Sequence, residues 1–255
     1  MSQLFYLSAE QLERIKPFFP RSHGIPRVDD RKVISGIIYV IKHGLQWKDA
    51  PREYGPYKTL YNRFLRWSRM GVFNNIFTEL AKTAGKDGRL MIDATHLKAH
   101  RTAASLLKKG LFSRCIGRTK GGLNSKLHAL CDGHGRPLAL TLTEGQVSDY
   151  KGATLLMDAL PEARELLADR GYDADWFRDA LRARGITPCI PPRMSRKRPI
   201  SYDKNLYKQR HKIEIMFGRI KDWRRIAMRY DRCAHTFFSA LCLAASIIFI
   251  SINEA

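Results

Sequence analysis

The sequence predicts a mixed α/β (α+β) fold in which a helical module precedes a domain with a mixed sheet flanked by helices. Two observations support this prediction. Up to residue 85, apolar residues recur at the three- and four-residue spacing of an amphipathic helix. From residue 86 on, short apolar runs alternate with helical segments, which is typical of a sheet covered by helices. We therefore divide the chain into residues 1–85 and 86–255.

The composition is that of a globular protein with a sizeable core. Of the 255 residues, 44% are hydrophobic, which excludes disorder as the main state. The five cysteines are sparse, odd in number and contain no C-x-x-C pair, so neither a disulfide scaffold nor a structural zinc site is expected. The first residues lack the pattern of a signal peptide, and we expect a cytoplasmic protein.

The chain is strongly basic, with 45 Lys and Arg against 24 Asp and Glu and a net charge of +21. This charge makes nucleic acid the leading partner, although a merely basic protein has the same signature. Residues 98–126 carry eight Lys or Arg and no acid, and residues 193–232 carry fourteen against four. A charge run is often only a solvated face, but two dense runs beside apolar segments favour surfaces that contact phosphates.

Three helices are expected in the first 85 residues. Ser8 and Gln11 have the spacing of a capping box that opens the first helix. Apolar positions between residues 28 and 43 form a helical stripe that stops at Gly44, and residues 57–69 form the third helix. The last two suggest a helix-turn-helix-like module whose basic face contacts DNA, although basic amphipathic helices are common. The residues predicted to contact DNA from this face are Lys58, Asn62, Arg63, Arg66 and Arg69.

The second part of the chain is expected to start with a hairpin-rich sheet. Strands are predicted at residues 89–95, 126–131, 137–143, 164–168 and 187–191, and helices at 150–160, 175–184 and 203–230. This order is that of an RNase H-like domain. The apolar run at 237–252 is shorter than the roughly 20 residues that span a bilayer, so a buried C-terminal core helix is favoured over a membrane anchor.

Three acids stand out in this domain. Asp93 lies inside the first strand, where burying an acid is costly, and Asp169 ends a later strand. Glu214 lies in the middle of the predicted helix over 203–230. Strand ends and a facing helix can bring the three together. Each also has a purely structural interpretation, because Asp93 can pair with a core arginine, Asp169 can cap a turn and Glu214 can be a surface residue.

The predicted helix groups Glu214 with three other polar residues. At 100° per residue, Tyr207, Arg210, Glu214 and Lys221 share a sector of about 60°. A carboxylate flanked by cations on one helical face is either a salt-bridged surface or a site for metal-assisted phosphodiester chemistry. In the second case the carboxylate holds the metal and the cations bind phosphates.

The spacing Tyr207-x2-Arg210-x3-Glu214-x6-Lys221 resembles the Tyr-Arg-Glu-Lys signature of bacterial insertion-sequence DDE transposases, in the group around insertion sequences four and five. The segments MIDATHLKAH and ADRGYDA resemble the surroundings of that family's first and second catalytic aspartates, here Asp93 and Asp169. The N-terminal segment from Gly44 and the segment from Gly117 are similar to the insertion-sequence-five branch. The resemblance covers nearly the whole chain, roughly residues 5–250.

This resemblance implies an RNase H-like nuclease and strand transferase. Asp93, Asp169 and Glu214 would be the catalytic acids and would hold two Mg²⁺ or Mn²⁺ ions. Arg210 and Lys221 would bind phosphates beside Tyr207. Further DNA contacts are expected from Lys98, Arg118, Lys120, Arg224 and Arg225.

The sequence therefore predicts a DNA transposase of an insertion sequence. We expect it to bind terminal inverted repeats, cleave the DNA ends and join the 3′-hydroxyls to target DNA. We also expect a homodimer or higher assembly on DNA, and no membrane partner. A domesticated relative that retains only nuclease activity is the alternative enzyme. A non-catalytic DNA-binding repressor is the contrasting class, although a repressor has no need of the three acids together.

Overall fold

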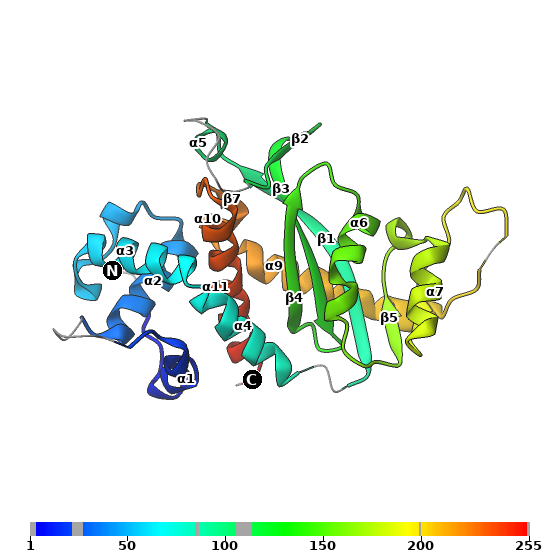
Figure 1. Cartoon of the computed structure of the whole chain (residues 1–255), viewed down its shortest axis with the longest axis horizontal. Helices are drawn as coiled ribbons and strands as arrows, with labels where there is room; N and C mark the ends of the chain where they lie inside the picture. Colours follow the sequence, from blue (N-terminus) through cyan, green and yellow to red (C-terminus); the bar gives the residue numbers. More distant parts are fainter. Residues whose placement is uncertain (1–3, 22–27, 85–86, 106–113, 199, 254–255) are drawn as a thin grey trace.

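The structure is a computed structural model that describes residues 4–21, 28–84, 87–105, 114–198 and 200–253. Its centre is a seven-stranded mixed sheet with helices on both faces, and the N-terminal helices lie beyond one of these faces (Figure 1). The elements follow the predicted order in the chain, with helices up to residue 82 and the first strand at Arg89. The predicted mixed fold is confirmed.

The N-terminal helices form where the sequence predicts them. In α1 (Ala9–Ile15), Ser8 and Gln11 make the reciprocal hydrogen bonds of the capping box. The next helix, α2 (Asp30–His43), ends at Gly44, whose left-handed backbone (φ 75°) suits a residue without a side chain. Helix α3 (Tyr57–Arg69) has the predicted bounds and is followed by α4 (Val72–Lys82).

The sheet is built on two long strands, β1 (Arg89–Ala99) and β3 (Gly122–Asp132), which pair antiparallel. A hairpin connects β3 to β4 (Pro137–Glu144), as the turn at residues 132–135 predicts. On the other side of β1, β5 (Glu165–Leu167) and then β6 (Thr187–Cys189) add in parallel. Three antiparallel strands followed by two parallel ones, in the order β4-β3-β1-β5-β6, give the RNase H-like topology.

The short elements complete this framework. The three-residue strand β2 (Gly117–Thr119) pairs with the start of β3 and was not predicted. Helix α5 (Arg101–Ala104) follows β1 directly. Helices α6 (Asp149–Leu156) and α7 (Asp175–Ala183) connect the later strands, close to their predicted bounds.

The prediction of one long helix over residues 203–230 was wrong. The segment divides into α8 (Lys204–Tyr207), the 3-10 turn η6 (Lys208–Arg210), α9 (His211–Lys221) and α10 (Arg224–Ala227). The main break falls at Trp223, which has extended backbone angles and is buried. Strand β7 (Met228–Arg229) then pairs with Lys98 and Ala99 of β1. Tertiary pairing and burial of Trp223 thus override the helical pattern.

Two apolar clusters cover the two faces of the sheet. On one face, Leu90 and Ile92 of β1 pack with α6 and α7. On the other face, Met91 and Leu97 of the same strand belong to a cluster that includes α9, α11 (Ala234–Asn253) and the N-terminal helices. The N-terminal helices therefore share a continuous core with the sheet domain.

Helix α11 is the predicted C-terminal core helix. Among the described helices it alone is long and apolar enough to cross a membrane, with a mean hydropathy of 1.8 over Ala234–Ser251. However, 72% of that segment is buried inside the fold, against α4, α9 and β4. Its apolar surface is thereby accounted for within the protein.

Candidate active site

Asp93 lies in the middle of β1 and faces the helices. Side chains alternate between the two faces of a strand, so Asp93 and Thr95 share the face of the buried residues Met91 and Leu97. The Asp93 carboxylate accepts a hydrogen bond from the backbone N–H of Ala94 at 2.8 Å, and 17% of its side chain is exposed. The predicted acid is therefore mostly buried, on the face covered by α9.

Asp169 follows β5, the parallel neighbour of β1. The register pairs Arg89 with Glu165 and Met91 with Leu167. Continuing that register by two residues brings Asp169 beside Asp93. Its carboxylate also caps the 3-10 turn η5 (Arg170–Tyr172) by accepting from the N–H of Gly171 at 2.8 Å. Asp169 therefore has the predicted structural role of a turn cap while lying next to the first acid.

The signature residues of the last helices face the same part of β1. The Arg210 guanidinium donates to Asp93 Oδ2 at 2.8 Å and also to Glu214 one turn further along. It lies over the ring of Tyr207, with 5.9 Å between the guanidinium carbon and the ring centroid. Lys221 Nζ donates to Thr95 Oγ1 at 2.6 Å, two residues along β1 from Asp93. Because the break at Trp223 comes after Lys221, it does not separate Lys221 from the other signature residues.

The burial of the site changes its proton equilibria. Burial raises the pKa of Asp93 to about 6, and Asp169 adds to this, although the Ala94 N–H and Arg210 act in the opposite direction. Burial lowers the pKa of Lys221 and raises that of Tyr207. A carboxylate that loses water in this way gains from a nearby cation.

The three acids are not all close together in this structure. Asp93 and Asp169 interact, whereas the Glu214 side chain is 55% exposed and bonds to Arg210. In the part of the chain that the structure describes, no group of three or more His, Cys, Asp or Glu side chains is close enough to hold a metal ion. The chemistry of the donors nevertheless fits Mg²⁺ or Mn²⁺, because carboxylate oxygens are the ligands these ions prefer. Arg210 supplies the positive charge between Asp93 and Glu214.

The predicted DNA-contacting residues divide into exposed and internal ones. Arg63 pairs with Asp30 at 2.6 Å and is only 13% exposed, while Arg225 donates to the Leu45 carbonyl and is buried. Both guanidiniums are bonded to other residues of the protein, which argues against the predicted contacts of Arg63 and Arg225 with DNA. The other eight are exposed: Lys58, Asn62, Arg66, Arg69, Lys98, Arg118, Lys120 and Arg224.

A fourth acid borders the site, although the sequence identifies it only as the start of a helix. Asp149, the first residue of α6, pairs with Lys126 of β3 at 2.8 Å. A Cβ placed on Gly171 would lie 2.8 Å from Asp169 Oδ1 and 3.3 Å from Asp149 Oδ2, so both carboxylates border this glycine. The signal available in the sequence was Lys126, a lysine within an apolar strand.

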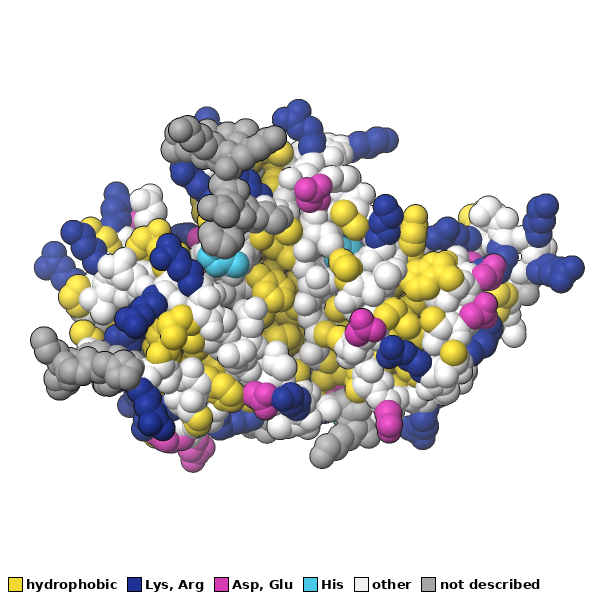
Figure 2. Space-filling model, viewed as in Figure 1, with side chains coloured by type: hydrophobic (Ala, Val, Ile, Leu, Met, Phe, Trp, Pro, Cys, Tyr) yellow, Lys and Arg dark blue, Asp and Glu magenta, His cyan; other side chains and the backbone are white. Residues whose placement is uncertain are grey.

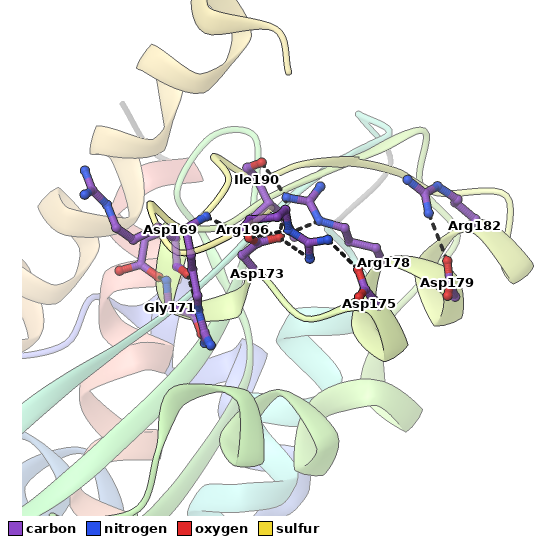
Figure 3. A network of polar contacts seen from close by, with 11 residues as sticks. Asp169, Gly171, Asp173, Asp175, Arg178, Asp179, Arg182, Ile190 and Arg196 are labelled. Atoms are coloured by element: carbon purple, nitrogen blue, oxygen red, sulfur yellow. Dashed lines mark hydrogen bonds and ion pairs between the residues drawn. The ribbon is translucent and has the colours of Figure 1, made fainter. Parts of the chain in front are cut away.

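A second network surrounds Asp173, four residues after Asp169 (Figure 3). The sequence favours Asp173 as a turn residue, but its buried carboxylate pairs with Arg178 and Arg196. Arg178 is itself buried and donates to the Ile190 carbonyl at 2.8 Å. Asp173 therefore ties α7 to the segment after β6.

Two family models together match most of the chain. The model described as "Putative transposase of IS4/5 family" matches residues 7–77, and the one described as "Transposase DDE domain" matches residues 84–249. The first covers the N-terminal helices and the second covers the sheet, the three acids and α11.

Relatives point to the same group. A Brucella ovis protein named "Putative transposase for insertion sequence element IS6501" is 33% identical over 129 residues, which are 50% of this chain and 99% of the relative. A Burkholderia cepacia protein named "Putative transposase for insertion sequence element IS402" is 35% identical over 155 residues, 53% of this chain and 71% of the relative. Among solved structures, a piggyBac transposase in a synaptic complex with hairpin DNA is similar in fold. Its TM-score is 0.56 at 11% identity, over 95% of this chain and 71% of that one.

Proposed function

The chain belongs to the DDE transposases of bacterial insertion sequences, and we propose that it cuts DNA at the terminal inverted repeats of its own element and joins the freed 3′-hydroxyls to target DNA. The observation that carries this proposal is the group formed by Asp93, Asp169 and Glu214 with Arg210. Arg210 bonds to two of the acids, and the third follows the neighbouring strand.

In this proposal Asp93, Asp169 and Glu214 hold the metal, as two Mg²⁺ or Mn²⁺ ions. When bound, the ions would activate the attacking water or 3′-hydroxyl and stabilise the leaving oxygen. Arg210 and Lys221 bind the phosphates that flank the scissile bond, because they are the cations nearest to Asp93 and Thr95 on β1. The ring of Tyr207 packs beside the Arg210 guanidinium and orients it.

The two parts of the chain have different tasks in this proposal. Residues 1–85 read the repeat sequence through the exposed face of α3, with Lys58, Asn62, Arg66 and Arg69 in contact with DNA. Residues 86–255 cut the DNA, and Lys98, Arg118, Lys120 and Arg224 extend the phosphate-contacting surface. The matches to two separate family models support this division. The protein acts in the cytoplasm on the nucleoid, as a homodimer or larger assembly that pairs two DNA ends.

The test is a cleavage assay with the full chain. Duplexes that carry the inverted repeats flanking the gene should be cut in Mg²⁺, and the cut ends should join to a plasmid. Asp93→Asn, Asp169→Asn and Glu214→Gln should each abolish cleavage, because each removes a metal ligand and little volume. The matched control is Asp179→Asn, an acid on α7 whose side chain is 70% exposed and pairs with Arg182.

The outcomes distinguish the possible functions. Cleavage without joining identifies a nuclease that has lost strand transfer. Binding to the repeats without cleavage identifies a repressor. If any one of the three variants cleaves at the wild-type rate, that residue is not a metal ligand.

A further inference from the structure

A basic loop protrudes from the domain beside the Asp169 turn. Residues 191–198, PPRMSRKR, connect β6 to the segment before α8 and contain four cations and no acid. In Figure 1 the loop extends away from the sheet beyond α7, and Figure 2 shows Lys and Arg side chains at that end of the molecule. Its tip is open to solvent, since Met194 is 93% exposed. These cations begin the basic run at residues 193–232, and none of them is among the individual DNA contacts assigned above.

The base of the loop is held by Asp173 (Figure 3). Asp173 Oδ2 accepts from the N–H of Arg193 at 2.7 Å and from Arg196 Nε at 2.9 Å. Its other oxygen accepts from Arg178 Nε at 2.8 Å. Burial alone would raise the pKa of Asp173, but hydrogen bonds from Arg196, the Arg193 N–H and Arg178 outweigh it and lower the pKa to about 2. The loop is therefore anchored by hydrogen bonds and ion pairs to a buried carboxylate whose charged form they favour.

The same loop contacts the turn that carries Asp169. Arg193 donates from Nη2 to the Gly171 carbonyl at 2.8 Å and from Nε to the Arg170 carbonyl at 3.2 Å. The N–H of Gly171 in turn donates to Asp169 Oδ1 at 2.8 Å. One residue, Gly171, thus separates the Arg193 side chain from the Asp169 carboxylate.

The remaining cations of the loop are available to a ligand. Lys197 and Arg198 are exposed and form no ion pair with any other residue that the structure describes. A pocket of about 420 Å³ lies between them, Arg193 and Arg196. The two acids at this pocket, Asp173 and Asp175, are both paired with Arg196. An excess of positive charge therefore faces the solvent here, as a site for polyanions requires.

We propose that the loop at residues 191–198 binds the phosphate backbone of duplex DNA, and that Arg193 is a positioning residue that links the DNA-bound loop to the Asp169 turn. The inference rests on the proposed function for the identity of the partner, and it adds to that function a contact and a positioning role. DNA bound at Lys197 and Arg198 holds the loop in place, and Arg193, through its bonds to the Arg170 and Gly171 carbonyls, keeps the peptide that holds the Asp169 carboxylate in position.

The binding step is tested with the double variant Lys197→Gln/Arg198→Gln in the full chain. Its affinity for duplex DNA is measured by anisotropy at several salt concentrations. Loss of two phosphate contacts should reduce the slope of log Kd against log salt by about two and weaken binding by about tenfold at low salt. The matched control is Arg182→Gln/Arg184→Gln, which removes two exposed cations at the other end of α7 and should leave the slope unchanged.

The positioning step is tested with Arg193→Lys, which keeps the charge but loses the planar fork that donates to two carbonyls. The rate of cleavage at saturating DNA should fall by about tenfold or more, whereas Kd should change by about twofold at most. If Arg193 had a purely structural role, the substitution would change both the cleavage rate and Kd, or neither of them. A rate equal to that of the wild type overturns the positioning role.

Two substrates show whether the loop contacts the DNA of the element's end or the target DNA. A loss confined to the repeat duplex assigns the loop to the element's end, and a loss confined to joining into a plasmid assigns it to target DNA. An unchanged salt slope with both substrates, or an equal loss in the control, overturns the binding role. Failure of the proposed function is visible separately, because the wild-type protein would then not cut repeat DNA at all.

Discussion

The guanidinium of Arg210 bridges Asp93 in the middle of β1 and Glu214 on α9, with 2.8 Å between Arg210 Nη1 and Asp93 Oδ2. These carboxylates come from distant parts of the chain and would repel each other at close range. The bridge compensates for the cost of burying Asp93. In the proposed mechanism, Asp93 and Glu214 would be compensated by the metal that they hold, which would leave Arg210 available to a phosphate.

Arg210→Gln and Lys221→Gln should each lower the rate of single-turnover cleavage by about 10²-fold or more, because each removes a cation that stabilises charge on the reacting phosphate. The measurement uses saturating DNA, with Mg²⁺ titrated separately. Arg219→Gln, an exposed residue of the same helix, is the control. If excess Mg²⁺ restores the full rate, the two residues support metal binding instead. If the rate does not change at all, neither residue contacts the reacting phosphate.

Arg63→Gln should lower stability and Arg66→Gln should weaken DNA binding, although the two residues are only three positions apart on α3. Arg66 is exposed, so its loss should weaken binding to repeat DNA by roughly 1–3 kcal/mol and change stability by less than about 0.5 kcal/mol. Loss of Arg63 removes its 2.6 Å ion pair with the part-buried Asp30 and should cost roughly 1–3 kcal/mol of unfolding free energy. Anisotropy with repeat and random duplexes and urea unfolding give the two quantities. Equal effects on repeat binding would contradict the assignment of Arg66 to the reading face.

Gly171→Ala should reduce cleavage more than it reduces stability. The added Cβ would lie 2.8 Å from Asp169 Oδ1, and moving that carboxylate should lower the rate by about tenfold or more. The fold loses little, because a carboxylate tip can shift without displacing the backbone. Gly121→Ala is the control, since the nearest atom to its added Cβ, apart from the adjoining residues, is Thr119 Oγ1 at an ordinary contact distance of 3.8 Å. A wild-type cleavage rate in Gly171→Ala would show that the Asp169 position tolerates displacement.

His128 on β3 should contribute a loss of stability between pH 6.5 and 4, which Asp93 opposes below about pH 6 because its raised pKa lets the folded chain bind a proton before the unfolded chain does. The ring is fully buried and bonds to Thr143. Burial, together with Lys126 and His96 and against Asp149, lowers the pKa of His128 to about 4. As pH falls through 6.5, the unfolded chain binds a proton that the folded chain does not, which costs up to about 1.4 kcal/mol per pH unit.

This pH dependence is measured by urea unfolding of the wild type and His128→Gln over that range. The slope of unfolding free energy against pH should be less positive in His128→Gln than in the wild type, because the His128 contribution is lost. His211→Gln, which replaces an exposed histidine at the start of α9, should keep the wild-type slope. Identical slopes in all three proteins would assign the acid sensitivity to other groups.

Local patterns in the sequence predicted the parts of the fold that local interactions determine. The capping box at Ser8, the bounds of α3 and the β3–β4 hairpin were all predicted from a few neighbouring residues. The long helix over 203–230 was predicted wrongly, because the extended pairing of Met228 and Arg229 with β1 depends on residues 130 positions earlier. Strand β2 escaped notice because its three residues contain no apolar pattern.

The candidate site was predicted to a similar extent. The spacing from Tyr207 to Lys221 indicated one face of a helix, and that face does meet β1. The partner of each cation was not predictable, because a helical projection does not identify what lies opposite. Arg63 illustrates this limit, since its partner Asp30 is on another helix. Asp149 was likewise hidden by its ordinary role as the first residue of α6.

The core that the N-terminal helices share with α11 and the sheet has a mechanical consequence for where the DNA is cut. The described N-terminal helices pack into the same core as α11 and one face of the sheet. In the proposed function, this core holds the repeat-reading face of α3 at a fixed distance from the acids that cut the DNA. Inserting base pairs between the repeat sequence and the scissile bond should therefore move the cut by the same number of pairs relative to the element's end, or prevent cleavage. The packing of α11 against the N-terminal helices thus determines how many base pairs separate the repeat sequence from the cut.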